Sequence, residues 1–131
     1  SLIIEGYADY NSRSDDRSEN TLKLFAGYRG DDFKGGVEIF SRSNEFGGGE
    51  GTIKISGISV FSSQPIMAKL KGFVRFDAVQ NDGKDVTDIL VIAGLDHSPR
   101  TNLHWMPNLY VEKPDGGDPT IQGRMTVYFK F

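Results

Sequence analysis

The sequence predicts an all-β protein built from eight antiparallel strands, and three observations support this. Apolar and polar side chains alternate along most of the 131 residues, which is the period of a strand with two different faces. Glycine occurs sixteen times and phenylalanine nine times, and no long helical pattern is present. Short segments rich in Gly, Asp, Asn, Ser and Pro separate the alternating stretches. Strands joined without helices are expected to pair antiparallel.

The alternating stretches give the ranges of the predicted strands. These ranges are 2–10, 21–29, 33–42, 52–62, 69–78, 86–96, 103–112 and 121–131. The last stretch, IQGRMTVYFKF, alternates most regularly. The fourth alternates only in its first half, where Ile53 and Ile55 are expected on the apolar face and Lys54 opposite them. Its second half, 58–62, is compatible with a bulge.

Several features indicate that the apolar face meets lipid. The connections after the first, third, fifth and seventh strands are longer than those after the second, fourth and sixth, as in outer-membrane barrels. The apolar face is rich in glycine and alanine, which would leave voids in a packed core but none against lipid. The sequence therefore predicts an antiparallel up-and-down transmembrane β-barrel, with eight strands in this chain. The expected location is the bacterial outer membrane, with both termini periplasmic and the longer loops extracellular.

The alternative fold is a soluble β-barrel or sandwich, including a lipocalin-like carrier with an apolar cavity. A soluble barrel also alternates apolar and charged residues, so alternation does not separate the two. Strands of roughly nine to eleven residues favour the membrane, since they match a tilted span.

Aromatic residues of the apolar face gather near the strand ends, as in the girdles that flank a membrane barrel. Phe61 is expected on this face as well. The predicted girdle residues are Tyr10, Tyr28, Phe33, Phe76, Trp105 and Phe129.

The polar face is predicted to line an interior with a net positive charge. Such an interior favours the passage of small anionic or polar solutes. The residues expected to line this pore are Lys23, Lys34, Glu38, Arg42, Lys54, Lys69, Lys71, Arg75, Asp77 and Arg124. The alternative is a narrow barrel plugged by interior ion pairs, with a structural or assembly role and no conductance.

No catalytic or metal-binding set emerges from the sequence. There is no cysteine, and the two histidines, His97 and His104, lie seven residues apart without partners. The acidic loops do not match an EF-hand, and no G-x-S-x-G elbow is present. The sequence thus predicts no enzyme, no metal and no cofactor. The net charge of −3 gives no reason to expect a nucleic-acid partner.

From Gly57 onward, three motifs and the chain end carry a family resemblance. These are an R-F-D motif at Arg75, an A-G-L-D strand at Ala93, an M-P-N strand at Met106, and the terminal Phe131. This part of the chain resembles the C-terminal region of bacterial outer-membrane porins of the phosphate-selective-porin-like kind.

The resemblance implies barrels of about sixteen strands. The chain would then be a single compact barrel domain over 1–131 or the C-terminal half of a larger porin. Phe131 looks like the signal read by the barrel-assembly machinery. The implied partners are outer-membrane lipid, that machinery during biogenesis, and other envelope subunits or further copies of the chain.

Overall fold

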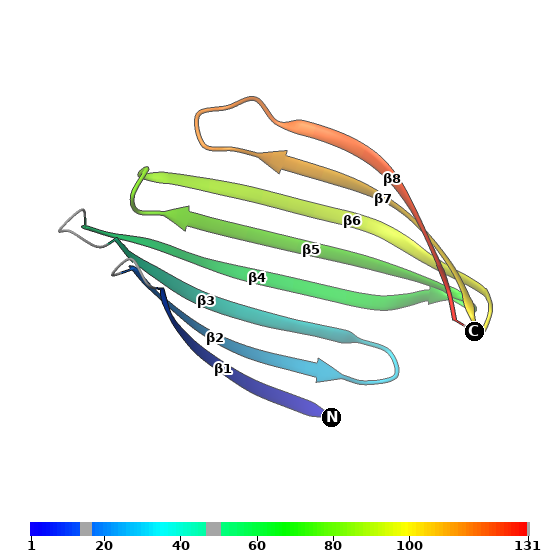
Figure 1. Ribbon diagram of the computed structural model, residues 1–131. Coiled ribbons are helices and arrows are strands. Elements are labelled where there is room, and N and C mark those ends of the chain that lie inside the picture. Colours follow the sequence, from blue (N-terminus) through cyan, green and yellow to red (C-terminus); the bar gives the residue numbers. More distant parts are fainter. Residues whose placement is uncertain (14–16, 47–50, 131) are drawn as a thin grey trace.

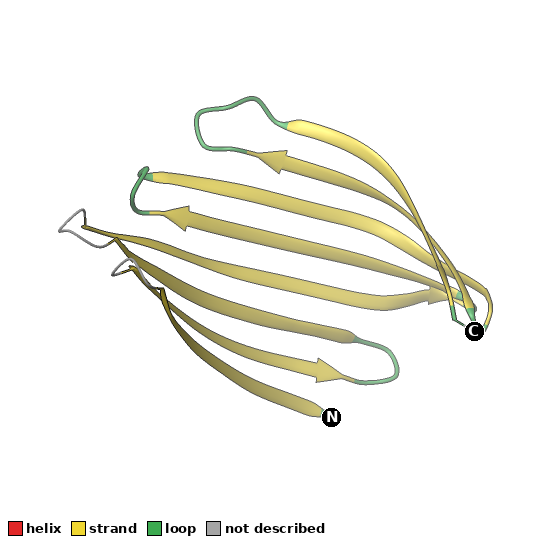
Figure 2. Ribbon diagram, in the orientation of Figure 1, coloured by secondary structure: helices red, strands yellow, loops and turns green. Residues whose placement is uncertain are grey.

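The computed structural model describes residues 1–13, 17–46 and 51–130 and shows one antiparallel sheet there (Figure 1). Each strand pairs with its neighbours in sequence, and the described residues contain no helix (Figure 2). The prediction of an all-β, up-and-down arrangement of eight strands is confirmed. The strands are β1 (Leu2–Arg13), β2 (Arg17–Arg29), β3 (Lys34–Phe46), β4 (Gly51–Met67), β5 (Leu70–Asn81), β6 (Val86–Arg100), β7 (Leu103–Lys113) and β8 (Thr120–Phe129).

The two ends of the sheet differ in their connections (Figure 1). The β2–β3, β4–β5 and β6–β7 turns lie at the same end as the two chain termini, and we call this the turn end. The other connections lie at the opposite end, which we call the loop end. The strands reach further toward the loop end than the sequence predicts. The expected polar loop at 11–20 is largely strand, with Ser12 opposite Ser18, because backbone pairing does not require apolar side chains.

The sheet is curved and twisted, and its two edges are β1 and β8 (Figure 1). Within the described residues β8 pairs only with β7, so the last strand does not close on the first. Each edge strand therefore presents one side of its backbone without a sheet partner.

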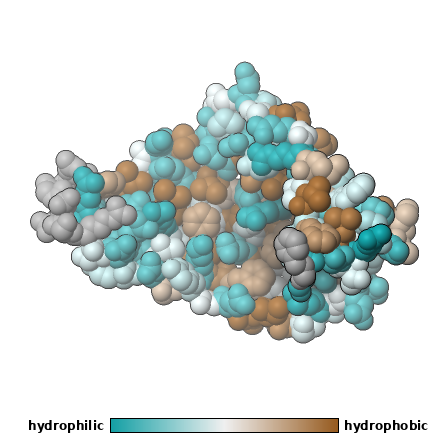
Figure 3. All heavy atoms as spheres, turned by 45° about the vertical axis from the view of Figure 1, so that its right-hand side comes forward, coloured by the Kyte–Doolittle hydropathy of each residue, from teal (hydrophilic) through white to brown (hydrophobic). Residues whose placement is uncertain are grey.

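The pairing register defines two faces, because residues directly opposite each other share a face. One face carries a row of apolar residues that crosses all eight strands, and we call it the outer face. We call the opposite face the inner face. No hydrophobic residue among the described side chains is buried, and Leu2 on the outer face is 71% exposed. In the space-filling view, hydrophobic residues lie at the surface beside polar ones (Figure 3). The row consists of Ile4, Ala26, Val37, Val60, Phe76, Val91, Val111 and Ile121.

The apolar part of the outer face runs obliquely across the sheet. The row that starts at Leu2, at the turn end of β1, reaches β8 at Gly123. The apolar stretch of β8 continues to Phe129, which is six residues closer to the turn end than Gly123. A stagger of six residues over seven strand steps corresponds to a strand tilt of about 30°, for a rise of about 3.3 Å and a spacing of about 4.8 Å. Tilted strands are what a barrel wall requires.

The structure corrects the predicted faces of the fourth strand. The β3–β4 register runs without interruption from Lys34–Ser63 to Phe46–Gly51, so the expected bulge at 58–62 is absent. The irregularity of β4 lies instead between Pro65 and Met67. Ile58 is consequently on the outer face, together with Lys54, whereas Ile53, Ile55 and Phe61 are on the inner face.

Candidate functional site

The inner face carries most of the charged residues that the sequence predicts to line a pore. Two of the ten predicted residues lie elsewhere. Lys54 shares the outer face with Ser56 and Ile58. Lys69 is in the β4–β5 turn at φ 66°, where its Nζ donates to the Pro99 carbonyl oxygen at 3.3 Å. The residues that the register places on the inner face are Lys23, Lys34, Glu38, Arg42, Lys71, Arg75, Asp77 and Arg124.

The described strand residues do not show the predicted excess of positive charge on this face. Among the strand side chains that the structure describes, the register gives the inner face eight cations and eight acids. The balance differs from the prediction because Lys54 and Lys69 lie elsewhere and Lys130 follows the end of β8, while the extension of β2 adds one cation, Arg17, and one acid, Glu19. The cations are Arg17, Lys23, Arg29, Lys34, Arg42, Lys71, Arg75 and Arg124. The acids are Glu5, Asp9, Glu19, Glu38, Asp77, Asp88, Asp96 and Glu112.

A polar recess lies on the inner face of β1, β2 and β3, with a volume of about 600 Å³. It brings together Lys23, Glu38 and Arg42, three of the predicted pore-lining residues. Arg42 Nη2 is paired with Glu19 Oε2 at 2.7 Å at its edge, and the two side chains are 44% and 24% exposed. Such a wall offers charges of both signs and hydrogen-bonding groups to small polar solutes. The remaining lining residues are Tyr7, Asp9, Thr21 and Phe40.

Two further pairs on the inner face involve carboxylates. Arg75 Nε donates to both carboxylate oxygens of Asp77 at 2.9 Å, so these two predicted pore-lining residues pair along one strand. His104 Nδ1 lies 2.8 Å from Asp96 Oδ1, and the ring of Tyr128 meets the imidazole edge-on at 5.9 Å. The Asp96–His104 pair was not anticipated, because its members lie on different strands and only the sheet register brings them together.

Arg124 has a different environment. Its guanidinium carbon lies 3.9 Å from the ring centroid of Tyr110, and its Nε and Nη2 donate to Gln122 Oε1 at 3.3 Å and 2.9 Å. Within the described part of the chain it contacts no carboxylate. Its partners on the inner face are thus a ring and a neutral amide.

Aromatic rings also lie on the inner face. Phe25 and Phe61 are stacked with 6.0 Å between ring centroids and 2° between planes. Alternation continued from Ile53 and Ile55 along the strand predicts Phe61 on the apolar face, whereas the register places it on the inner face. The sequence holds a signal for the correct face, because the alternation of polar and apolar residues on β3 and β5 is regular. Pairing β4 with these two strands would place Phe61 on the inner face.

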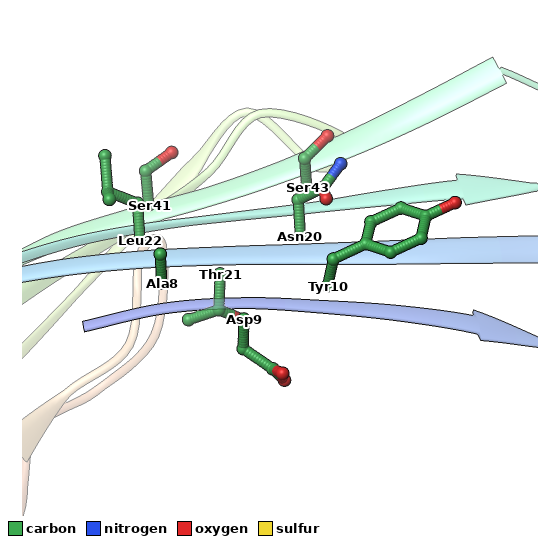
Figure 4. A pocket seen from close by; sticks show the side chains of 8 residues that line it. All are labelled: Ala8, Asp9, Tyr10, Asn20, Thr21, Leu22, Ser41 and Ser43. Atoms are coloured by element: carbon green, nitrogen blue, oxygen red, sulfur yellow. The ribbon is translucent and has the colours of Figure 1, made fainter.

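Most of the predicted girdle residues lie on the outer face near the ends of strands. Tyr28 and Phe33 stack at the β2–β3 turn, with 6.4 Å between centroids, and Trp105 and Phe129 lie at the same end of the sheet. Tyr10 lies toward the loop end beside a shallow hollow left by the small side chains of Ala8, Ser41 and Ser43 (Figure 4). Phe76 lies in the middle of β5, so its predicted position in a girdle is corrected. Phe131 is outside the described residues.

Across 1–13, 17–46 and 51–130 no group of three or more His, Asp or Glu side chains is arranged to hold a metal ion. No helix in these ranges is long and apolar enough to cross a membrane.

Eight tilted antiparallel strands, an apolar outer face without a core behind it and a charged inner face are the features of an outer-membrane β-barrel wall. A solved structure agrees with this class. The chain is similar to OmpTdeltaL8, a loop L8 deletion mutant of OmpT, an outer membrane protein of Vibrio cholerae, with a TM-score of 0.81 at 13% sequence identity. The match covers 98% of this chain and 49% of that chain, so the present chain spans about half the length of that protein. No protein-family model matches the sequence, and no curated protein matches it.

The comparison shows the barrel fold, leaves one expectation without support and corrects another. It gives no support to the narrower likeness to phosphate-selective porins. The prediction that the chain is not an enzyme does not stand either. That prediction rested on the lack of a catalytic set in the sequence. The chain shares its fold with OmpT, and a barrel fold does not determine function, which depends on the residues of a local site. At 13% identity this fold supplies no ground for excluding an activity, and we withdraw the exclusion.

Proposed function

We propose that this chain forms half of the wall of a porin-like barrel in a bacterial outer membrane. The observation that supports the proposal is the structural match to an outer-membrane protein. It covers 98% of this chain but 49% of that protein. The resemblance of the C-terminal motifs to porins points the same way.

The open edges of β1 and β8 support completion by further strands. In the hydrocarbon core an unpaired strand edge is strongly unfavourable, because no water is available to the free N–H and C=O groups. We infer that additional strands of a longer polypeptide pair with both edges. Completion by a second copy or by another envelope subunit is the alternative.

The inner face supports a wet interior open to small polar solutes. Its charges of both signs and its polar recess favour hydrated solutes over apolar ones. We place the turn end and both termini in the periplasm and the loop end outside the cell. In this proposal the barrel-assembly machinery inserts the protein into the lipid, and Phe131 belongs to its recognition signal.

The test is made on the full-length protein purified in detergent. The proposal expects unheated samples to migrate differently from heated samples on a gel, because folded barrels resist unfolding at low temperature. It also expects discrete conductance steps in planar bilayers. A protein that is monodisperse in buffer without detergent would contradict membrane insertion.

A plugged barrel remains the second candidate function because three inner-face pairs involve carboxylates: Arg42–Glu19, Arg75–Asp77 and His104–Asp96. Such pairs could close a narrow lumen. A heat-modifiable protein that never produces conductance steps would favour this candidate over the porin.

A further inference from the structure

We propose that Arg124 is an anion-contact residue of the inner face and shifts the ion selectivity of the pore toward anions. This inference rests on the proposed porin function. It concerns one side chain whose charge is held in place but is not neutralised by any residue in the described part of the chain.

The contacts of Arg124 hold its guanidinium without cancelling its charge. The plane lies against the Tyr110 ring at 3.9 Å, and one edge donates to Gln122 Oε1 through Nε and Nη2. An arginine has five N–H donors, so the contacts to Gln122 leave roughly three for a ligand. The stacked ring restricts the rotamers of a side chain that would otherwise be mobile.

The neighbours of Arg124 on the sheet are also uncharged. Asn108 lies directly opposite on β7, and its Nδ2 donates to the Met106 carbonyl oxygen at 3.1 Å. Glu112 is the next inner-face acid along β7 and lies opposite Thr120, four residues from Arg124 along β8. That separation is about 13 Å along the strand, which exceeds the Debye length at physiological salt.

Two other arginines of the inner face serve as internal comparisons. Arg75 bonds both oxygens of Asp77 at 2.9 Å, and Arg42 is 2.7 Å from Glu19. Each of those pairs carries little net charge toward a passing ion. Arg124 is the same residue type on the same face, and it has no carboxylate partner among the described residues, so it presents a full positive charge in the middle of β8.

The chemistry of the site defines the ligand class. A guanidinium with free N–H groups binds chloride as a charge and binds carboxylate or phosphate oxygens through two parallel hydrogen bonds. Permeating anions of small size are therefore the expected ligands, and chloride is the simplest probe.

The experiment measures the reversal potential of the full-length protein in planar bilayers under a KCl gradient. Arg124→Gln should lower the chloride-to-potassium permeability ratio by up to about sixteenfold, because one charge at about 5 Å in a water-like dielectric favours chloride about fourfold and disfavours potassium about fourfold. Arg124→Lys should keep most of the ratio, since it keeps the charge.

The matched control is the double variant Arg75→Gln with Asp77→Asn, which removes an arginine of the same face without changing the net charge. Its ratio should equal that of the unmodified protein. Each variant must first show the same heat-dependent gel shift, so that a loss of folding is recognised.

Conductance steps with a reversal potential unchanged by Arg124→Gln would overturn this inference and leave the porin proposal intact. A ratio that falls equally in the double variant would also overturn it, because the effect would then not depend on the absence of a carboxylate partner. The absence of conductance steps from the unmodified protein would overturn the porin proposal, and this inference with it.

Discussion

Phe73 on β5 lies directly opposite Gly94 on β6, and its ring covers the space where a side chain at position 94 would stand. A Cβ atom built on Gly94 would be 2.6 Å from the ring Cζ and 2.7 Å from the Pro107 carbonyl oxygen. Gly123, on the outer face of β8, has no such neighbour within 4 Å. The two glycines thus have different structural roles, since one lies beneath a ring on the inner face and the other lies in open space on the outer face.

Substituting Gly94→Ala should destabilise the folded barrel by about 1–3 kcal/mol, as expected for overpacking against atoms that cannot move freely. The carbonyl of Pro107 belongs to the paired strand, so its displacement would disturb the sheet. Urea unfolding of the full-length protein in lipid vesicles, followed by the gel shift, measures the change.

Gly123→Ala is the matched control and should be neutral or slightly stabilising, by up to about 1 kcal/mol, because glycine is the more flexible residue when unfolded. Equal destabilisation by both substitutions would contradict the assignment of these glycines to different faces.

If the outer face of β4 meets lipid, the cost of placing a charge there should depend on its depth in the membrane. Val60→Arg, within the apolar row, should destabilise the inserted protein by about 2–4 kcal/mol, whereas Ser56→Arg, closer to the loop end, should cost about 0–1 kcal/mol. Both positions lie on the same face of the strand, separated by Ile58. Refolding titrations in vesicles compare the two, and a similar cost at both sites would argue against a lipid boundary between them.

Sequence alternation was sufficient to assign the faces of most strands, and the limits of that method are visible on β4. On β5 and β8 a single parity separates apolar from charged residues, so their faces were predicted correctly. On β4 the isoleucines change parity between Ile55 and Ile58. The inner face of β4 carries isoleucine and phenylalanine, so apolar residues occur on both faces and alternation does not tell the faces apart. Only the register with β3 assigns them.

Trp105 is the one tryptophan of the chain, so tryptophan fluorescence measures the depth of this residue in the membrane. It is 49% exposed on the outer face at the turn end. In vesicles its emission should shift to shorter wavelength than in urea, and quenchers placed near the lipid headgroups should act on it more strongly than quenchers at the bilayer centre. Stronger quenching from the centre would remove Trp105 from a girdle.

The open edges can be tested by cysteine pairs, since the chain has no cysteine of its own. Ile4→Cys combined with Val127→Cys should not form a disulfide within one chain if further strands separate β1 from β8. The control pair, Val37→Cys with Val60→Cys, lies directly opposite across β3 and β4 and should cross-link on oxidation. Electrophoresis without reductant distinguishes the two outcomes. Efficient cross-linking between β1 and β8 would indicate a closed eight-stranded barrel.

The candidate site was predictable only in part, for a physical reason. Lys23, Glu38, Arg42, Arg75 and Arg124 were placed on the correct face by alternation. Which charges pair is decided across strands, where the spacing between partners depends on turn length and register. The pairing of Arg42 with Glu19, 23 residues apart, and the stacking of Arg124 on Tyr110 therefore had no signature in the sequence.

The oblique course of the apolar residues across the outer face has a geometrical consequence for the bore of the barrel. At a tilt of about 30° and a strand spacing of about 4.8 Å, eight strands close at a backbone radius of about 7 Å, and sixteen close at about 14 Å. The smaller radius is filled by side chains, while the larger one leaves a water-filled passage. The number of strands that join β1 and β8 therefore determines whether Arg124 faces packed neighbours or flowing ions.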